Sequence, residues 1–271
     1  MIKTHIILVG CGKMGSALLE GWLKNGCSPE LLTVIEPESY KEITERYQVR
    51  AVASYAEVKN QLPNHTVIFA VKPQILSDIL PDYAVSPKID GYITIAAGKT
   101  IAFYESLLNG SKAVGLIRAM PNLPATIGCG MTGLCSNAHA NASQRQLAAQ
   151  LFAAVGESIW VEEENLLDAV TAISGSGPAY VFHFIEALSV AGKELGLDET
   201  TSMKLALATV HGGANLAWQS SAHVTELKKA VTSPKGTTEA ALSILEGKEG
   251  LVELIKKTTK AAAKRAKELA A

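Results

Sequence analysis

Three glycines with the spacing of a dinucleotide-binding loop follow the first apolar run of this 271-residue chain. Residues 6–9 read IILV, and residues 10–15 read GCGKMG. Gly10 permits a tight turn, Gly12 lets the backbone approach a pyrophosphate, and Gly15 lets the next helix pack closely on the strand. The N–H groups at the start of that helix would face the diphosphate. We therefore predict dinucleotide contacts from Val9, Gly10, Cys11, Gly12, Lys13, Met14 and Gly15.

A glycine turn with a purely structural role is the alternative to nucleotide binding. The neighbouring residues decide between the two, because the preceding run is typical of a buried strand and residues 17–23 have apolar side chains at helical spacing. The order of strand, glycine loop and helix is the context that dinucleotide binding requires. The sequence therefore favours nucleotide binding, although the loop alone names no reaction.

Glu36 follows a second predicted strand, residues 32–35, and lies 21 positions after Gly15. That spacing suits a carboxylate that accepts hydrogen bonds from the adenosine ribose hydroxyls, which favours NAD and would repel a 2′-phosphate. A carboxylate at a helix start, ahead of Pro37, is the alternative. The sequence leaves both interpretations open.

Two more strand ends are expected to line the same nucleotide. Residues 66–71 form a near-continuous apolar run, typical of a strand buried on both faces of a parallel sheet, and residues 92–95 repeat the pattern. Ligands of such sheets bind beyond the carboxyl ends of the strands. We therefore expect contacts to the nucleotide from Ala70, Val71, Lys72, Pro73, Ala96 and Ala97.

The order of the apolar patterns predicts two domains. Strand patterns alternate with helical ones up to residue 162, which predicts an α/β domain with a doubly wound (Rossmann) parallel sheet over residues 1–162. Its other strands are expected at residues 50–53, 113–117, 128–134 and 158–161. From the acidic run at residues 162–164 onward the patterns are helical only, which predicts an all-α domain over residues 163–271. Small side chains on its helices are consistent with an intertwined dimer, although monomeric bundles use them too.

Composition excludes several classes of partner. The chain is 48% hydrophobic and 19% charged, with a formal net charge of -1. This balance gives no electrostatic reason to expect nucleic acid or an anionic membrane as a partner, and the basic cluster at residues 256–267 is interpreted as a solvated helix face. No apolar stretch is long enough to span a bilayer, and the first strand begins too early for a signal peptide. We expect a cytoplasmic protein.

The four cysteines are Cys11, Cys27, Cys129 and Cys135, and they form no CxxC pair. Neither a zinc site nor a disulfide framework is expected from this spacing. Cys11 lies inside the glycine loop, where we interpret it as a small filler residue and not as a nucleophile.

Two turns in the helical half combine serine or threonine, glycine and proline. Residues 174–178 read SGSGP, and residues 232–238 read TSPKGTT. Each precedes a predicted helix and would offer N–H groups and hydroxyls where a helix dipole favours an anion. A capped helix start without a ligand is the alternative for each turn.

These turns, together with two stretches of the first half, resemble the pyrroline-5-carboxylate reductase family, whose enzymes complete proline synthesis. The other two stretches are the glycine loop with its partner strand end at residues 70–74, and the proline-bracketed loop MPNLPA at residues 120–125. The likeness extends from about residue 5 to about residue 250. It implies a dinucleotide domain, a helical domain through which the chain forms a homodimer, and often a higher assembly of dimers.

The resemblance also implies a reaction, hydride transfer from NADPH or NADH to the C=N bond of 1-pyrroline-5-carboxylate. A protonated imine is already electrophilic, so such a site needs neither a metal nor a lysine nucleophile. It must hold the carboxylate, orient the ring and hydrogen-bond the ring nitrogen. By resemblance, Thr238 is the catalytic residue that positions or relays the proton. The substrate-binding set implied is Ser233, Lys235, Gly236, Thr237, Thr238 and Ser176, and Met120 and Asn122 are implied to lie near the nicotinamide.

Three positions depart from the family pattern. Lys235 stands where most members have glycine, Lys229 stands where an aspartate commonly occurs, and Glu36 replaces the short polar or basic residues that often receive NADP. Two other functions therefore stay open. One is a β-hydroxyacid dehydrogenase, which shares the architecture but places an acid/base lysine in its helical domain. The other is a regulatory paralogue that binds nucleotide without turnover.

Overall fold

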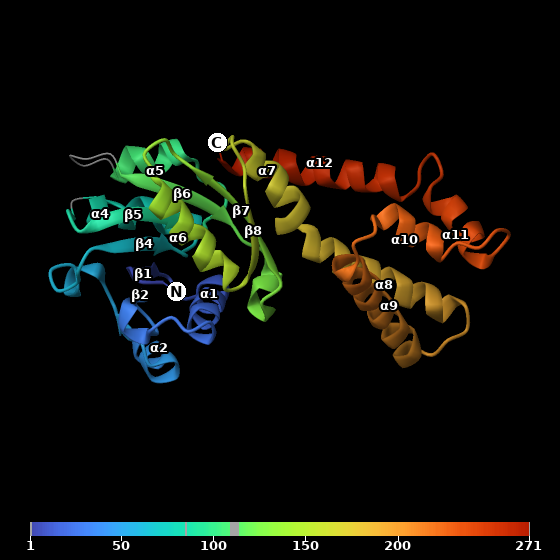
Figure 1. Ribbon diagram of the computed structural model, residues 1–271, viewed down its shortest axis with the longest axis horizontal. Helices are drawn as coiled ribbons and strands as arrows, with labels where there is room; N and C mark the ends of the chain where they lie inside the picture. The colour runs from blue at the N-terminus through green and yellow to red at the C-terminus, as the bar shows by residue number, and fades with distance from the viewer. Residues whose placement is uncertain (1, 85, 109–113, 271) are drawn as a thin grey trace. The chain divides into compact units, whose positions relative to one another are not determined.

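A computed structural model of the chain describes residues 2–84, 86–108 and 114–270 (Figure 1). The chain divides into two compact units, Met1–Ser176 with Ala262–Ala271, and Gly177–Ala261. This division falls later than the boundary at residue 162 that the sequence suggests. Helix α7 (Leu166–Val170) still packs against strand β7 (Gly130–Ser136), so the change from strands to helices precedes the change of unit.

The first unit is organised around an eight-stranded sheet with the order β3-β2-β1-β4-β5-β6-β7-β8. Strands β1 to β6 are parallel, and the strand order switches direction between β1 and β4. These strands confirm the predicted doubly wound sheet. The strands are β1 (His5–Val9), β2 (Leu32–Ile35), β3 (Arg50–Val52), β4 (His65–Phe69), β5 (Ile89–Thr94), β6 (Gly115–Met120), β7 (Gly130–Ser136) and β8 (Gly156–Trp160). Residue 113, where β6 was expected to begin, lies outside the described residues.

The sheet departs from the expected parallel arrangement at one place. Strand β7 runs antiparallel to β6, with Arg118 opposite Cys135, and β8 then runs parallel to β7. Only a short 3-10 turn (Leu123–Ile127) lies between β6 and β7. A parallel return needs a crossover connection of about a dozen residues or more. The sheet is therefore parallel from β1 to β6, as predicted, and becomes mixed where β7 joins it.

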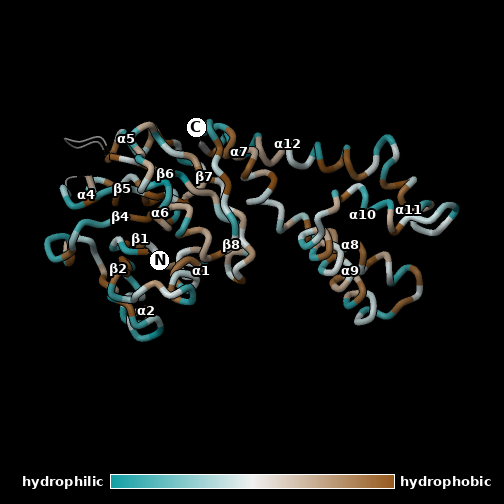
Figure 2. The backbone as a smooth tube through the Cα atoms, in the orientation of Figure 1, coloured by the Kyte–Doolittle hydropathy of each residue, from teal (hydrophilic) through white to brown (hydrophobic). Residues whose placement is uncertain are grey.

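Both faces of the sheet are buried, which explains the uninterrupted apolar runs of the sequence. Successive side chains of a strand point to opposite faces. Ile6 and Leu8 accordingly belong to one buried cluster, and Ile7 and Val9 to another. Figure 2 shows hydrophobic backbone segments concentrated along the strands in the interior of this unit.

Helices cover the sheet and are short on one side. The helices of the first unit are α1 (Lys13–Lys24), α2 (Tyr40–Tyr47), α3 (Leu76–Ile79), α4 (Pro81–Ala84), α5 (Ile101–Leu108), α6 (Ala142–Ala153) and α7 (Leu166–Val170). The indole N–H of Trp22 on α1 donates to the Leu151 carbonyl on α6 at 2.9 Å, which ties these two helices together. On the other face, Phe69 packs among the rings of Tyr83, Tyr92 and Tyr104.

The second unit contains helices and no strand throughout Gly177–Ala261, as predicted. Its helices are α8 (Gly177–Glu194), α9 (Glu199–Gln219), α10 (Val224–Ala230), α11 (Thr237–Leu245) and the first part of α12 (Leu251–Ala270). Helices α8 and α9 pack as a hairpin whose turn uses Gly196 with φ +97°. A Cβ at Gly192 would lie 2.9 Å from the Ser202 hydroxyl, so a small residue is required where the two helices meet.

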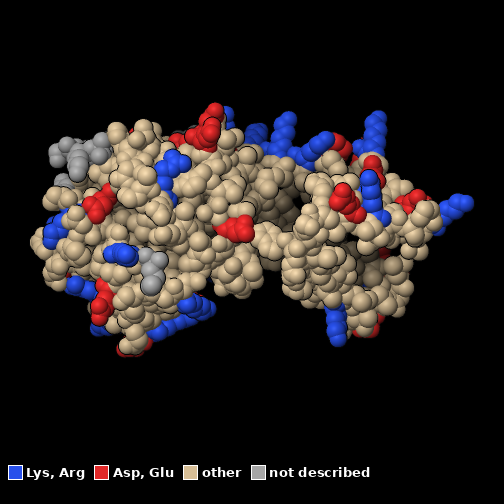
Figure 3. Space-filling model, in the orientation of Figure 1, with Lys and Arg blue, Asp and Glu red and all other residues tan. Residues whose placement is uncertain are grey.

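Helix α12 presents a basic surface to solvent. Figure 3 shows Lys and Arg side chains gathered over this helix. The exposed basic residues are Lys256, Lys257, Lys260, Lys264, Arg265 and Lys267. This agrees with the interpretation of the cluster as a solvated helix face. None of the helices in the described part of the chain is long and apolar enough to cross a membrane.

The aromatic cluster predicts a large stability effect for Phe69→Ala. Phe69 is fully buried, so the truncation removes ring contacts and leaves a cavity. We expect the free energy of unfolding to fall by roughly 3–5 kcal/mol in urea denaturation. Ile127→Ala, at a position that is 77% exposed, serves as the control and should change it by less than about 0.5 kcal/mol. Equal effects of the two substitutions would contradict the assignment of Phe69 to the core.

Candidate active site

The glycine loop is fixed by its close approach to the end of β4. Gly10 has φ +92°, and a Cβ there would lie 2.7 Å from both the Ala70 carbonyl oxygen and Val71 Cγ1. A Cβ at Gly15 would overlap the Gly10 carbonyl oxygen. At Gly12 a Cβ would meet nothing within 4 Å. Gly10 and Gly15 are therefore required by packing, whereas the space at Gly12 fits the close approach of a ligand.

Four of the stretches predicted to contact the nucleotide lie along one edge of the sheet. Strands β1, β4, β5 and β6 are successive neighbours, and their carboxyl ends carry the glycine loop, residues 70–73, residues 96–97 and residues 120–122. Backbone hydrogen bonds hold these ends together, because the Ala70 N–H donates to the Val9 carbonyl at 2.7 Å and the Ile95 N–H to the Phe69 carbonyl at 3.0 Å. The edge therefore offers an extended binding surface made of backbone and small side chains.

Glu36 contacts the glycine loop directly. Its carboxylate accepts a hydrogen bond from the Cys11 backbone N–H at 2.9 Å. Helix α2 begins only at Tyr40, so the alternative of a helix-start carboxylate does not hold. The contact places a negative charge beside the loop. The hydrogen bonds that Glu36 would accept from ribose hydroxyls stay a prediction.

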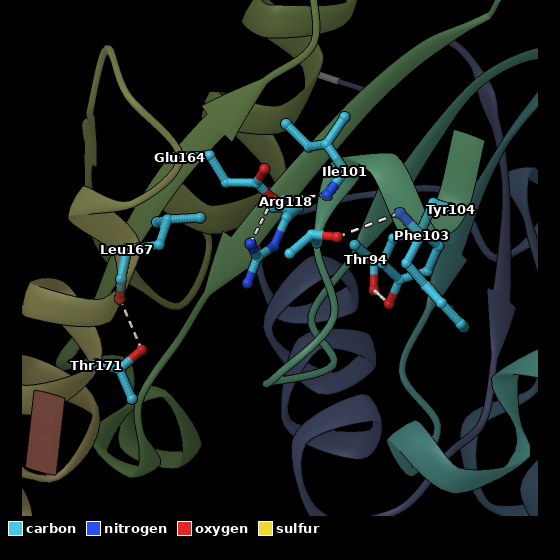
Figure 4. A network of polar contacts seen from close by, with 9 residues as sticks. Thr94, Ile101, Phe103, Tyr104, Arg118, Glu164, Leu167 and Thr171 are labelled. Carbon is cyan, nitrogen blue, oxygen red and sulfur yellow. Dashed lines mark hydrogen bonds and ion pairs between the residues drawn. The ribbon is translucent and has the colours of Figure 1, made fainter. Parts of the chain in front are cut away.

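Two charged residues that sequence reasoning missed form an ion pair at the same edge. The Arg118 guanidinium on β6 contacts the carboxylate of Glu164, and the Arg118 side chain is only 10% exposed. Glu164 also accepts the backbone N–H of Ile101, the first residue of α5, at 2.6 Å (Figure 4). The sequence offered Glu164 only as part of an acidic run, and it gave no reason to pair it with a residue on another strand.

The side chain of Asn122 is occupied within the protein. Its Oδ1 accepts the Met131 N–H at 2.9 Å, and its Nδ2 donates to the Ser174 carbonyl at 3.0 Å. The second contact has a clear cause: Pro178 has no N–H to donate to the carbonyl four residues before it, and Asn122 supplies that hydrogen bond instead. The implied position of Asn122 near the nicotinamide stays a prediction.

The first of the two serine-glycine-proline turns is not an open turn. Residues Thr171–Gly175 form one turn of π-helix that continues α7 toward α8. The Ser176 N–H donates to the Thr171 carbonyl at 2.8 Å, and the Ser174 hydroxyl donates to the Val170 carbonyl at 3.1 Å. The Ser176 N–H therefore has a partner within the protein, and the substrate contact implied for Ser176 stays a prediction. Turns of π-helix occur frequently at functional sites.

The second turn forms before α11 as expected, but its amide groups have internal partners. Lys235 adopts φ +60°, a left-handed conformation that glycine adopts more easily. Its N–H donates to the Glu239 carboxylate at 2.7 Å, and the Gly236 N–H donates to the Ser233 carbonyl at 3.0 Å. Two of the three amide groups expected to hold a substrate carboxylate are thus engaged. Sequence reasoning did not anticipate Glu239.

Comparisons with known proteins give the family. A family model described as pyrroline-5-carboxylate reductase dimerisation matches residues 164–269, and one described as NADP oxidoreductase, coenzyme F420-dependent, matches residues 5–98. The pyrroline-5-carboxylate reductase of Pseudomonas aeruginosa is 36% identical over 273 residues, covering 100% of this chain and 98% of that protein. That of Synechocystis is 38% identical over 271 residues, covering 99% of each. The chain belongs to the pyrroline-5-carboxylate reductase family.

Solved structures of this family have the same fold. A pyrroline-5-carboxylate reductase structure from Coxiella burnetii has a TM-score of 0.91 at 35% identity and covers both chains completely. One from Plasmodium falciparum, described with NADP bound, has a TM-score of 0.83 at 29% identity and also covers both chains completely. The expected fold class is therefore confirmed, as is an oxidoreductase that uses a nicotinamide dinucleotide. The dimerisation domain supports a homo-oligomer.

Departures from the pyrroline-5-carboxylate reductase pattern now have a structural context. Lys235, where the family usually has glycine, occupies the left-handed position of its turn. Cys11 lies next to Glu36, and burial, with that carboxylate as the second cause, raises the pKa of its thiol to about 11. All four cysteines are free thiols.

Among the residues described, no group of three or more His, Cys, Asp or Glu could hold a metal ion.

The raised pKa predicts that Cys11 resists alkylation. Below its pKa the thiol stays protonated, so at pH 8 only about one molecule in a thousand carries the reactive thiolate. We expect iodoacetamide at pH 8 to label the exposed Cys129 well before Cys11, as measured by peptide mass spectrometry, and Cys11 labelling to rise steeply as the pH approaches 11. Labelling of Cys11 as fast as Cys129 at pH 8 would contradict this environment.

Proposed function

We propose that this chain reduces 1-pyrroline-5-carboxylate to L-proline, the last step of proline biosynthesis, with the residue roles given below. The observation that carries the proposal is the full-length similarity to pyrroline-5-carboxylate reductases combined with the glycine loop on β1 and the TSPKGTT turn before α11. In the reaction, C5 of the imine gains a hydride and the ring nitrogen keeps one proton as the C=N double bond becomes a single bond.

The carboxyl edge of the first unit fits a nicotinamide dinucleotide. Gly12 has open space where a pyrophosphate would approach, and α1 begins immediately beyond it with its N–H groups toward the loop. The reduced nicotinamide supplies the hydride when the dinucleotide is bound. Glu36 would accept hydrogen bonds from the ribose and disfavour a 2′-phosphate, which makes NADH the expected better partner. The residues predicted to bind the dinucleotide are kept in this proposal. Asn122 would act indirectly, by holding the backbone at Met131 and Ser174.

The TSPKGTT turn would hold the substrate. Ser233 and the amide groups of Lys235, Gly236 and Thr237 would receive the carboxylate, since the start of α11 favours a negative charge. Thr238 would place its hydroxyl against the ring nitrogen. A threonine hydroxyl is a poor acid by itself, so it would position or relay the proton. The substrate contact implied for Ser176 stays a prediction, and it would have to come from the side chain, because the N–H is already donated to Thr171.

Glu239 adds a condition to this assignment. Its carboxylate accepts the Lys235 N–H at 2.7 Å and so occupies an amide that the substrate carboxylate would need. Two carboxylates at one amide would also repel each other. Glu239 would therefore have to rotate away when the substrate binds, and it would weaken substrate binding compared with a neutral residue.

The helical unit would form the dimer. Its helices expose many large apolar side chains, which is typical of a surface that another protein chain covers. The most exposed of them include Phe182, Leu195, Trp218, Val231, Ile244 and Leu254. A higher assembly of dimers, a cytoplasmic location and the absence of nucleic acid and membrane partners stay as predictions.

The direct test is oxidation of NADH and NADPH, followed at the nicotinamide absorbance, with 1-pyrroline-5-carboxylate as substrate. Imine-dependent oxidation with a larger kcat/KM for NADH is the expected result. A folded protein that binds nucleotide without oxidising it would favour the regulatory paralogue. Oxidation of a β-hydroxyacid with NAD or NADP, in the absence of imine reduction, would favour the dehydrogenase alternative.

Thr238→Ala is expected to lower kcat by about 100-fold with little change in the KM for the dinucleotide, because it removes a group that moves or positions a proton. The matched control is Thr200→Ala, which removes an exposed hydroxyl elsewhere in the same unit and should leave kcat unchanged. Steady-state kinetics with the imine measures both variants. Wild-type kcat in Thr238→Ala would remove Thr238 from the mechanism.

Glu239→Gln is expected to lower the KM for the imine by about fivefold, because a neutral amide competes less well for the Lys235 N–H and does not repel the substrate. Glu249→Gln, a neutralisation elsewhere in the same unit, should leave this KM unchanged. A KM that is unchanged or raised in Glu239→Gln would mean that the carboxylate does not compete with the substrate.

A further inference from the structure

The Glu164 carboxylate joins two elements that are far apart in the sequence. It accepts a hydrogen bond from the Ile101 N–H, 63 residues away, and it pairs with Arg118, 46 residues away. Figure 4 shows the carboxylate between the guanidinium on β6 and the first residue of α5. The contact with Ile101 is part-buried, and the Glu164 side chain is 29% exposed. The geometry therefore makes Glu164 a cap of α5 that comes from outside the helix.

The N-terminus of α5 has backbone N–H groups that such a cap can satisfy. The first N–H groups of a helix have no partner within the helix. The Thr100 hydroxyl accepts the Phe103 N–H at 3.2 Å, and Glu164 accepts the Ile101 N–H. A carboxylate at this end also interacts favourably with the helix dipole. Loss of the Glu164 carboxylate would weaken the hold on the first residue of α5.

The loop between β5 and α5 is held at its other end as well. The Thr94 hydroxyl is hydrogen-bonded to the Tyr104 hydroxyl at 2.5 Å and accepts the Ala96 N–H at 3.3 Å. Thr94 and Tyr104 are buried, and burial raises the pKa of Tyr104 to about 12. The short loop that carries Ala96 and Ala97 is therefore fixed by Thr94 on one side and by Glu164 on the other.

The ion pair with Arg118 holds the Glu164 carboxylate in place. The Arg118 guanidinium is almost fully buried, so separation from Glu164 would leave an uncompensated buried charge. Arg118 also lines a small cavity at the carboxyl edge together with Ala97, Gly98 and Met120. The ion pair thus lies directly beside residues assigned to the nicotinamide side of the cofactor site.

We propose that Glu164 is a positioning residue for the nicotinamide side of the dinucleotide site. By capping α5 and pairing with Arg118 it sets the backbone of Ala96 and Ala97 for cofactor binding, without touching cofactor or substrate itself. This inference rests on the proposed function for the identity of the cofactor. It goes beyond that function because it assigns a role to a carboxylate that no motif marks.

The test compares Glu164→Gln with Glu163→Gln, which neutralises an exposed carboxylate one residue away. Glutamine keeps the shape of the side chain and removes the ion pair with Arg118. We expect the Kd for NADH, measured by fluorescence titration, and its KM to rise about tenfold in Glu164→Gln only, which corresponds to weakening a hydrogen-bonded contact with a charged group. The KM for the imine should change by less than about twofold, because the TSPKGTT turn lies elsewhere in the chain.

Each outcome decides the proposal. An unchanged Kd in folded Glu164→Gln overturns it, as does an equal rise in the KM for both substrates, which would indicate a general structural defect. If that variant fails to fold, Arg118→Lys replaces it, because lysine keeps the charge but loses the guanidinium geometry; a raised Kd for NADH supports the proposal and an unchanged one overturns it. If the wild-type protein binds NADH but does not reduce the imine, the proposed function fails while the Kd comparison still tests Glu164.

Discussion

The close approach of Gly10 to the end of β4 is the constraint on which the first unit depends. With only 2.7 Å between a Cβ at Gly10 and the Ala70 carbonyl, no larger residue fits, and the loop is held against the strand where the sheet changes its order. That contact brings the carboxyl ends of β1 and β4 together. A ligand that spans this edge then meets backbone and small side chains instead of bulky ones. Packing therefore requires glycine at positions 10 and 15, whereas the open space at Gly12 is the feature that suits ligand binding.

Three carboxylates act on backbone amides at the candidate sites, and each has a different consequence. Glu36 accepts the Cys11 N–H and orders the glycine loop. Glu164 accepts the Ile101 N–H and orders the loop after β5. Glu239 accepts the Lys235 N–H in the turn assigned to the substrate, where a second carboxylate would have to compete with it. The same interaction thus orders the edge predicted to bind the cofactor and occupies an amide of the turn proposed to hold the substrate.

The apolar patterns of the sequence predicted many of the helices and strands, because interactions between residues close in sequence largely determine these elements. The bounds of β2, Leu32–Ile35, were predicted to the residue, since a short apolar run and the charged residue that ends it are adjacent in the sequence. The direction of β7 and the π-helical turn at Thr171–Gly175 were not predicted. The first depends on the length of a connection, and the second on a carbonyl left without a donor by Pro178 and satisfied by Asn122, 52 residues away. Glu164 and Glu239 had no periodic signature, because their roles arise only when distant or strained backbone comes close to them.

The most direct measurement is the fate of deuterium carried at both hydrogen positions of C4 of the reduced nicotinamide. With 1-pyrroline-5-carboxylate as substrate, the product would be isolated and its labelled position determined by NMR. Direct hydride transfer predicts one deuterium at C5 of L-proline for each dinucleotide oxidised. Dinucleotide oxidation that yields unlabelled proline, or no proline, would contradict direct hydride transfer and with it the central assignment of this site.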